Sequence, residues 1–219
     1  MGPRPLARDV AGDDHGAGAG RRARRPGAAG ALPSQTLVQR VLVIGSGGAG
    51  KSTLAVRLGE RTGLPVVHLD RLYWRPGWVP TPRDEWPRTV AALLARDRWV
   101  MDGNYGGTLD QRLRACDTVV FLDLPRAVCA WRVVGRALRF RGRSRPDMGE
   151  GCPERVTYEF LRWIWHYPRR ARPEVLRKLA ALAADKTVVV LRSDAEVERF
   201  VGGLRASGGE RTTTEREGS

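Results

Sequence analysis

The stretch RVLVIGSGGAGKST, Arg40 to Thr53, decides the fold. Its first half, Arg40 to Gly45, is a continuous apolar run of strand length that ends at a glycine. Its second half, Gly45 to Thr53, fits the pattern G-x-x-x-x-G-K-S/T and opens a segment of helical character, which is where a phosphate-binding P-loop must lie. A strand, a glycine-rich loop and a helix are therefore expected at the start of the folded chain.

The loop predicts a site for the phosphates of ATP and for Mg²⁺. Glycines let backbone N–H groups turn inward around a phosphate chain, and the helix N-terminus adds its dipole. We expect Lys51 to reach the β and γ phosphates and the Ser52 hydroxyl to bind the metal. The nucleotide-binding residues expected here are Gly45, Ser46, Gly47, Gly48, Ala49, Gly50, Lys51, Ser52 and Thr53.

Four further apolar runs follow the first: LPVVHLD (64–70), DRWVMDG (97–103), DTVVFLDLP (117–125) and KTVVVLRS (186–193). Runs that are apolar on both faces are typical of a parallel sheet covered by helices. Helices are predicted at about 51–61, 82–96, 126–140, 153–166, 172–184 and 194–203. The sequence thus predicts an α/β fold of three layers around a five-stranded parallel sheet.

Two acidic residues are expected at the ends of strands beside the loop. Ligands of open α/β sheets bind at the carboxyl ends of the strands, so Asp70 and Asp102 should both face the phosphates. Asp102 follows its strand as a metal-binding acid does, directly or through water, while Asp70 is placed to accept a proton from a substrate hydroxyl or to orient it. Either carboxylate is alternatively a turn or helix cap. His68 is expected on the same strand face as Asp70 and has a substrate-binding and a structural interpretation.

Alternate arginines mark ALRFRGRSRPD, Ala137 to Asp147. The preceding residues from Pro125 onward predict a helix with an apolar stripe, followed by a loop punctuated by Gly142, Ser144 and Pro146. This pattern favours a mobile lid whose arginines close over ATP, with contact to nucleic acid or a solvated basic face as alternatives. The stripe comprises Val128, Trp131, Val134 and Leu138. The arginines of the other face are Arg132, Arg136, Arg139 and Arg143. The candidate catalytic residues are Lys51, Asp70, Arg136, Arg139 and Arg143.

The acceptor of the phosphoryl group is expected after Asp70. The segment YWRPGWVPTPRDEW, Tyr73 to Trp86, combines three tryptophans with two arginines, and aromatic walls with few polar anchors are typical of small-molecule sites. Tryptophans also fill cores, so this segment has a packing interpretation as well. EFLRWIWHYP indicates amphipathic packing with Phe160, Trp163 and Tyr167 on one side.

Composition limits the class of protein. The formal charge is +14, and residues 1–36 carry only six arginines against three aspartates, so most of the charge belongs to the middle of the chain. No helix-turn-helix, zinc or OB-fold pattern accompanies it. No apolar run reaches the length of a membrane span and no secretory leader is present, so a cytoplasmic protein is expected. The three cysteines, Cys116, Cys129 and Cys152, lack metal-ligand spacing and are expected to be buried thiols.

The expected organisation has three parts. Residues 1–38 and 205–219 are rich in Gly, Ala, Arg, Ser and Thr and are expected to be disordered. Residues 39–204 form the kinase-like domain, with a substrate lobe at about 70–97 and a lid at about 140–155. Nothing in the sequence selects between a monomer and a dimer.

Several motifs together resemble a known family. The segments that carry the similarity are the P-loop, HLDRLYWRPGWVPTPRDEW, RWVMDGNYGGTLDQRL, DTVVFLDLPR, RFRGRSRPDMGEGCPER and EFLRWIWHYP. Over Arg40 to Val201 the chain is similar to the adenylate-kinase-related proteins called DNA topology modulation proteins. The resemblance implies a nucleoside-monophosphate-kinase-like fold with a short arginine-rich lid. Asp102 and Gly103 resemble the Asp-Gly pair after the third strand of adenylate kinases, and Asp70 resembles the acid of shikimate-type and gluconate-type kinases. Adenylate kinases continue with an arginine that grips the acceptor phosphate, whereas this chain has Asn104, Tyr105, Gly106 and Gly107, which argues against AMP.

The sequence therefore predicts a phosphotransferase that moves the γ-phosphoryl group of Mg·ATP to a small acceptor, a nucleotide or a hydroxylated metabolite. The alternative is a nucleic-acid-associated P-loop NTPase or a DNA-binding regulator of DNA topology. A kinase would consume ATP in response to a small acceptor, whereas the alternative would bind DNA with an affinity that falls steeply with salt.

Overall fold

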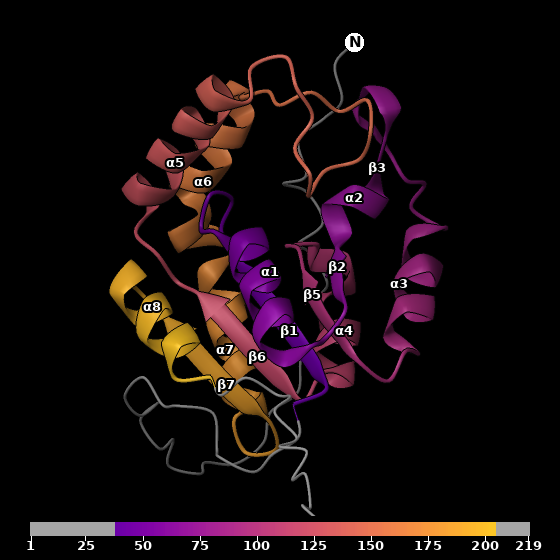
Figure 1. Cartoon of the computed structure of the whole chain (residues 1–219), viewed down its shortest axis with the longest axis vertical. Coiled ribbons are helices and arrows are strands. Elements are labelled where there is room, and N and C mark those ends of the chain that lie inside the picture. The colour runs from indigo at the N-terminus through magenta and orange to yellow at the C-terminus, as the bar shows by residue number, and fades with distance from the viewer. Residues whose placement is uncertain (1–37, 205–219) are drawn as a thin grey trace, which may run out of the picture.

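The computed structural model describes residues 38–204, where five parallel strands form the central sheet. They are β1 (Arg40–Gly45), β2 (Val66–His68), β5 (Trp99–Asp102), β6 (Thr118–Leu122) and β7 (Thr187–Leu191). Their order is β2-β5-β1-β6-β7, so the strand that precedes the P-loop lies in the centre (Figure 1). All five predicted strands and their parallel pairing are confirmed. A separate antiparallel ribbon joins β3 (Trp74–Arg75) to β4 (Val79–Pro80).

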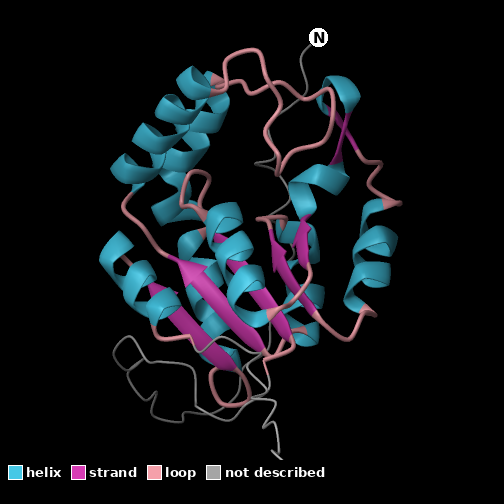
Figure 2. Cartoon of the chain, viewed as in Figure 1, coloured by secondary structure: helices cyan, strands magenta, loops and turns pink. Residues whose placement is uncertain are grey.

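Helices cover both faces of the sheet, which confirms the three-layer α/β prediction (Figure 2). Side chains of β1 alternate between two cores, with Val41 and Val43 in one and Leu42 and Ile44 in the other. The first core is closed by α1 (Lys51–Thr62), α5 (Arg126–Arg139) and α8 (Asp194–Gly202). The second is closed by α3 (Trp86–Leu94), α4 (Leu109–Ala115) and α7 (Arg172–Leu182), and α6 (Tyr158–Arg170) contributes to both.

Two helices begin later than the sequence predicted. The helix expected from residue 82 begins at Trp86, because the Pro82 carbonyl accepts hydrogen bonds from the N–H groups of Glu85 and Trp86 in a preceding turn. The helix expected from residue 153 begins at Tyr158, after residues 153 and 154 have formed bridges with residues 144 and 141. Helix α4 was not predicted, since its seven residues are too few to show a periodic pattern.

Asp70 does not end the second strand, as the sequence had predicted. β2 stops at His68, and Asp70 is the second residue of the short helix α2 (Leu69–Tyr73). The chain turns here because Leu69 is fully buried against Gly103, whose φ of +138° places it in a region that favours glycine. A Cβ at Gly103 would lie 2.8 Å from the Leu69 Cβ, so the two segments fit only with glycine.

The helix predicted at about 126–140 is confirmed as α5, and its apolar stripe faces the core only in part. Val128 packs against the first core, whereas Trp131 is 78% exposed and Leu138 is 72% exposed. The side chains that α5 buries fully are Cys129 and Val133, which lie beside the stripe. The packing predicted for α6 is confirmed, with Phe160 stacked on Trp163 and Trp163 packed edge-on to Tyr167.

The extensions predicted at residues 1–38 and 205–219 lie outside the described residues, apart from Val38. Within the described part of the chain, no helix combines the length and the apolar character that crossing a membrane requires. The three cysteines are buried free thiols, as predicted.

Candidate functional site

The P-loop connects the carboxyl end of β1 to the first turn of α1, as its motif predicted. Gly48 and Gly50 have φ values of +77° and +91°, which side chains rarely adopt. The Ala49 N–H donates to the Ser46 carbonyl across the turn at 3.2 Å. Lys51 is the first residue of α1, so its side chain and the free N–H groups of the helix N-terminus face the same space.

The loop is held from outside by α5 and α6. A Cβ at Gly48 would lie 2.2 Å from the Cys129 carbonyl oxygen of α5, and one at Gly47 would lie 2.6 Å from the Phe160 ring of α6. The glycines therefore serve the fit of the loop against these helices as well as its turn. Sequence reasoning found the glycines but missed the helices against which they pack.

Lys51 lies deep in the site. Its ammonium donates to the Ser46 carbonyl at 2.9 Å. Burial lowers the pKa of Lys51, and the carboxylates of Asp70 and Asp102 oppose that shift, so both lie close enough to act on it. The Ser46 hydroxyl oxygen is buried and has no partner among the described residues. The site thus presents a partly buried cation and an unpaired polar atom beside the loop, which suits a phosphate chain.

Asp102 lies at the end of β5, next to the strand that carries the P-loop. Its register partner on β1 is Val43, and its side chain is buried. One oxygen, Oδ1, lies 3.0 Å from Nδ1 of His68, its partner on β2. This hydrogen bond raises the pKa of His68, while burial opposes the rise. The structure therefore gives His68 a role that the sequence did not predict, as the group that orients Asp102.

Asp70 is brought to the same site from α2. The Tyr105 hydroxyl donates to Asp70 Oδ1 at 2.6 Å. Burial raises the pKa of Asp70, whereas the Tyr105 hydrogen bond and the Lys51 charge act to lower it. The pKa of Tyr105 is itself raised well above its ordinary value, by burial and by the carboxylate. Tyr105 therefore acts as a fixed hydrogen-bond donor that aims the carboxylate.

Tyr105 is positioned in turn by Arg112, which is fully buried on α4. The guanidinium donates to three carbonyls of the turn between β5 and α4: those of Gly103 at 2.9 Å, Tyr105 at 2.5 Å and Thr108 at 3.3 Å. Burial lowers the pKa of Arg112 to about 10. Neither Tyr105 nor Arg112 was singled out as a site residue from the sequence, because the hydrogen bonds join side chains to a turn that no motif marks.

An aromatic cluster lines the acceptor side. The rings of Tyr73, Trp86 and Tyr105 pack mutually, with centroid distances of 4.6 to 5.0 Å. Trp74 of β3 packs edge-on against Tyr73 and against Trp78, which lies in the turn between β3 and β4. Trp86 is a buried core residue, which fits the packing interpretation of residues 73–86. Trp74 and Trp78 are partly exposed, which fits the interpretation as walls of a small-molecule site.

The arginines of α5 and the following loop divide into two groups. Arg132 lies beside the P-loop, since a Cβ at Gly50 would be 3.8 Å from its Nη1, and it is paired with Asp194 at 2.5 Å. Arg136 is close enough to Lys51 to lower its pKa further and is paired with Glu154 at 3.1 Å. Arg139 and Arg143 are exposed.

Arg145, in the loop after α5, lies nearest the acceptor side. Its guanidinium pairs with Glu154 and, at 2.8 Å, with Asp147, and its charge contributes to lowering the pKa of Asp70. The sequence placed Arg145 in the arginine cluster without assigning it a role. The cations brought toward the phosphate loop and its acid are therefore Lys51, Arg132, Arg136 and Arg145.

The oxygen atoms available for a metal come from few residues. Among the described residues, no group of three or more His, Cys, Asp or Glu side chains has the arrangement of a metal site. The Ser52 hydroxyl at the start of α1 and the Asp102 carboxylate are hard oxygen donors, of the kind that Mg²⁺ accepts when waters and substrate phosphates complete its shell. The donor set fits a metal that arrives with a nucleotide.

The sheet order and the P-loop after the central strand define a P-loop NTPase fold of the nucleoside-monophosphate-kinase type. No protein-family model matches the chain, and no curated protein matches it. Solved structures similar to it include a gluconokinase from Sinorhizobium meliloti 1021, at 19% identity and a TM-score of 0.45, covering 78% of this chain and 93% of that one.

Two further structures are similar at the same level. A shikimate kinase from Bacteroides thetaiotaomicron has 18% identity and a TM-score of 0.43, covering 76% of this chain and 96% of its own. A sugar kinase from a Janibacter species has 20% identity and a TM-score of 0.41, with 76% and 94% covered. Likeness at this level adds no argument about chemistry, which rests on the site itself.

Proposed function

We propose that the chain is an ATP-dependent kinase whose phosphoryl acceptor is a small hydroxylated molecule. The observation that carries the proposal is that Lys51, Asp70 and Asp102 lie close together at the carboxyl edge of the sheet. The charges of both carboxylates raise the pKa of Lys51, and the charge of Lys51 lowers the pKa of Asp70. The phosphate loop and Lys51 supply the binding of the donor phosphates. Asp70 supplies a base that a metal-binding acid alone would not provide.

Donor binding follows from the loop. Backbone N–H groups of the loop and of the first turn of α1 receive the phosphates, and the Lys51 ammonium exchanges the Ser46 carbonyl for a phosphate oxygen. Ser52 and Asp102 would hold Mg²⁺, which would supply positive charge to neutralise the donor phosphates. His68 keeps the Asp102 carboxylate oriented. Arg132, Arg136 and Arg145 add positive charge beside the loop.

Transfer follows from Asp70. The acceptor oxygen attacks the γ phosphorus, the bond from that phosphorus to the bridging oxygen of ADP breaks, and the hydroxyl proton passes to Asp70. Burial raises the pKa of this carboxyl, which makes it a better proton acceptor than an exposed aspartate. Tyr105 keeps one carboxylate oxygen fixed, so that the other is free to meet the hydroxyl.

The acceptor class follows from what surrounds Asp70. Arg112 of the 103–115 segment is fully buried, and three of its N–H groups donate to backbone carbonyls, so it is not presented to an acceptor phosphate. Arg75, in the aromatic segment, is paired with Glu85. Arg145, the arginine nearest the acceptor side, is paired with Asp147 and Glu154. A carboxylate beside aromatic rings suits an alcohol better than a phosphate monoester.

The test is ADP release from Mg·ATP by the full chain, alone and with a panel of polyols, hydroxylated acids, nucleosides, nucleoside monophosphates and duplex DNA. Acceleration by one hydroxylated compound, with phosphorylated product detected and no acceleration in Lys51→Ala, is the expected result. Stimulation by duplex DNA alone would replace the kinase with a nucleic-acid-dependent NTPase. Acceleration by a nucleoside monophosphate alone would keep the kinase and overturn the acceptor class.

A further inference from the structure

The outer face of α5 carries large apolar side chains that the fold does not cover. Trp131 and Leu138 are mostly exposed, and Val134 between them is partly so. On the neighbouring helix α6, Tyr158 is 74% exposed and Trp165 is about half exposed. Single exposed apolar residues are ordinary, but a contiguous group of this size marks an interaction surface.

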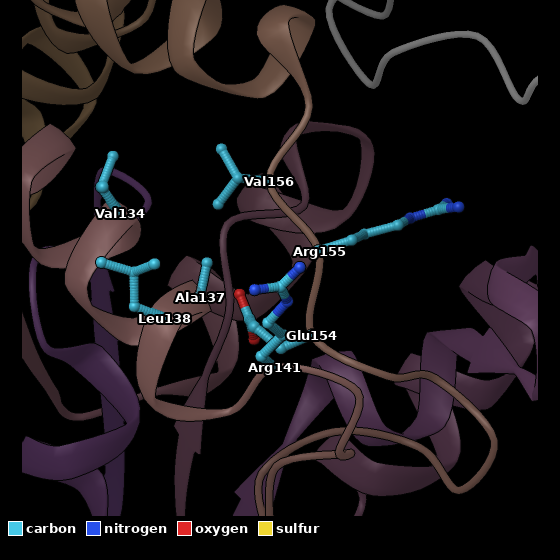
Figure 3. Close-up of a pocket in the computed structure, with 7 residues that line it drawn as sticks. All are labelled: Val134, Ala137, Leu138, Arg141, Glu154, Arg155 and Val156. Atoms are coloured by element: carbon cyan, nitrogen blue, oxygen red, sulfur yellow. The ribbon is translucent and has the colours of Figure 1, made fainter.

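These side chains line two neighbouring hollows that share Val134 and that we call together the groove. One part, of about 570 Å³, lies between α5 and α6 and includes Trp131, Val134, Tyr158 and Trp165. A second part, of about 240 Å³, continues from Val134 toward the end of α5. There Val134 and Leu138 of α5 and Val156 of the facing segment point toward a shared space (Figure 3). The lining residues of α5 run from Ala127 to Leu138, about 17 Å of helix, which is the length of a partner helix of about three turns.

The groove has a basic border. Arg162 lines the part between the helices, Arg141 lines the far part, and Arg126 lies over the Trp165 ring at 4.2 Å. The acidic residue that lines the groove, Glu154, is already paired with Arg136 and Arg145. The positive charge of the border is therefore not neutralised from within the groove.

We propose that this groove binds an amphipathic helix of a partner protein, with apolar side chains at helical spacing and acidic residues along its flanks. Grooves between two helices accept a third helix through anchors at positions i, i+3 or i+4, and i+7. Ala127, Ala130 and Ala137 lie along the floor, where small side chains let a partner backbone approach. Acidic flanks complement Arg126, Arg141 and Arg162.

Other occupants fit these observations less well. A second copy of the chain meeting this face through a two-fold axis would place the arginine borders against one another, which costs free energy. Nucleic acid would bind the arginines through its phosphates. Those phosphates would not cover the apolar side chains of Val134 and Leu138. The combination of an aliphatic floor and a basic border favours a protein helix.

Binding of the partner helix is also expected to depend on whether the nucleotide site is occupied. The inner sides of α5 and α6 hold the P-loop, through the Cys129 carbonyl beside Gly48 and the Phe160 ring beside Gly47. A phosphate chain that shifts the loop would shift these helices, and the groove lies on their other side. Occupation of the P-loop is therefore expected to change the affinity of the groove, with reciprocal effects on nucleotide binding.

The test uses a fluorescein-labelled designed helix of about 16 residues, with leucines at i, i+3, i+4 and i+7 spacing and glutamates on both flanks. Binding to the full chain is measured by anisotropy, beside a scrambled peptide of identical composition and a peptide with lysine in place of glutamate. The designed helix is expected to bind at least about tenfold more tightly than either. Equal binding of the scrambled peptide would overturn the proposal, since charge alone would then explain it.

Variants assign the binding to the groove. Trp131→Ser combined with Leu138→Ser is expected to weaken the designed helix at least about tenfold. Val56→Ser, at an exposed position of α1, is the control and should leave binding unchanged. Both variants should keep the melting temperature, because the side chains are exposed. Unchanged binding of the designed helix to the double variant would overturn the proposal. So would a full-chain dimer that the double substitution converts to a monomer, because the groove would then bind a second copy. Loss of duplex-DNA binding in the double variant would overturn it too, because the groove would then bind nucleic acid.

Discussion

Between Gly45 and Lys51 the phosphate loop is held by the fit of its backbone, whereas Asp70 is held by a series of side-chain hydrogen bonds through Tyr105 and Arg112. The loop packs so closely on α5 and α6 that an added methyl group would overlap a carbonyl oxygen or a ring. The acid, by contrast, is adjusted by polar contacts that can be removed one at a time. The two sides of one site should therefore respond differently to substitution.

Asp70→Asn separates the two sides most strongly. Loss of a general base typically lowers a rate by about 10²- to 10⁴-fold, and we expect a fall of this size in acceptor-dependent turnover. The affinity for ATP should not fall, because the amide leaves the contacts of the loop in place and removes a negative charge that acts on Lys51. Lys51→Ala is the matched control, since it should lose nucleotide affinity as well. Calorimetric titration with ATP and steady-state rates test both, and a large loss of ATP affinity in Asp70→Asn would remove the distinction.

Gly48→Ala tests the backbone fit of the loop. A φ of +77° is strained for alanine, and its Cβ would overlap the Cys129 carbonyl, so we expect a loss of about 2–6 kcal/mol in the free energy of unfolding. Gly135→Ala is the control, because Gly135 lies in α5 with nothing within 4 Å of an added Cβ. That substitution should stabilise the helix by about 0.5–1 kcal/mol. Urea unfolding measures both, and effects of the same sign would contradict the interpretation.

Arg112→Met tests the positioning of Tyr105. Removing the guanidinium leaves buried carbonyls of the turn at 103–108 without their donors, which should cost about 3 kcal/mol in the free energy of unfolding. Arg114→Met, on the exposed side of the same helix, should cost almost nothing. Thermal melting distinguishes them. Equal stability of the two variants would mean that the turn holds its shape without Arg112.

Tyr105→Phe should have the smallest effect, and its sign is specific. The Tyr105 hydrogen bond stabilises the ionised form of Asp70 and so lowers its pKa, against the rise that burial causes. Removing the hydroxyl should raise that pKa, and the acid limb of the pH–rate profile should move upward by about one pH unit. Tyr158→Phe, which is exposed, is the control. A shift of the limb to lower pH would contradict Tyr105 as a donor to Asp70.

The sequence predicted the strand, the glycine loop and the helix that carry Lys51, because their determinants are local. The apolar run, the glycines and Lys51 follow one another within fourteen residues, Arg40 to Thr53, and their chemistry depends on that spacing. Asp102 was also predicted to face the loop, since a residue at the end of a strand has a position that the sheet fixes.

The acceptor side could not be predicted in the same way. Tyr105 and Asp70 are hydrogen bonded although 35 residues separate them in the sequence. Arg112 binds the preceding turn through backbone carbonyls, which every residue type has. No pattern of residue types marks such contacts. The apolar stripe of α5 is a related case, because periodicity indicates an apolar face but does not say whether the chain itself covers it.

The central place of β1 in the sheet also bears on synthesis of the chain. β1 is made first but pairs with β5 and β6, so its second partner is complete only when residue 122 has been added. At about 5–20 residues per second, a ribosome needs roughly 4–15 s to make that stretch. Until then at least one edge of β1 has no partner strand, because β5 is complete at residue 102 and β6 only at residue 122. The nascent chain is therefore a natural client for chaperones, and slow translation between residues 45 and 118 would lengthen its exposure.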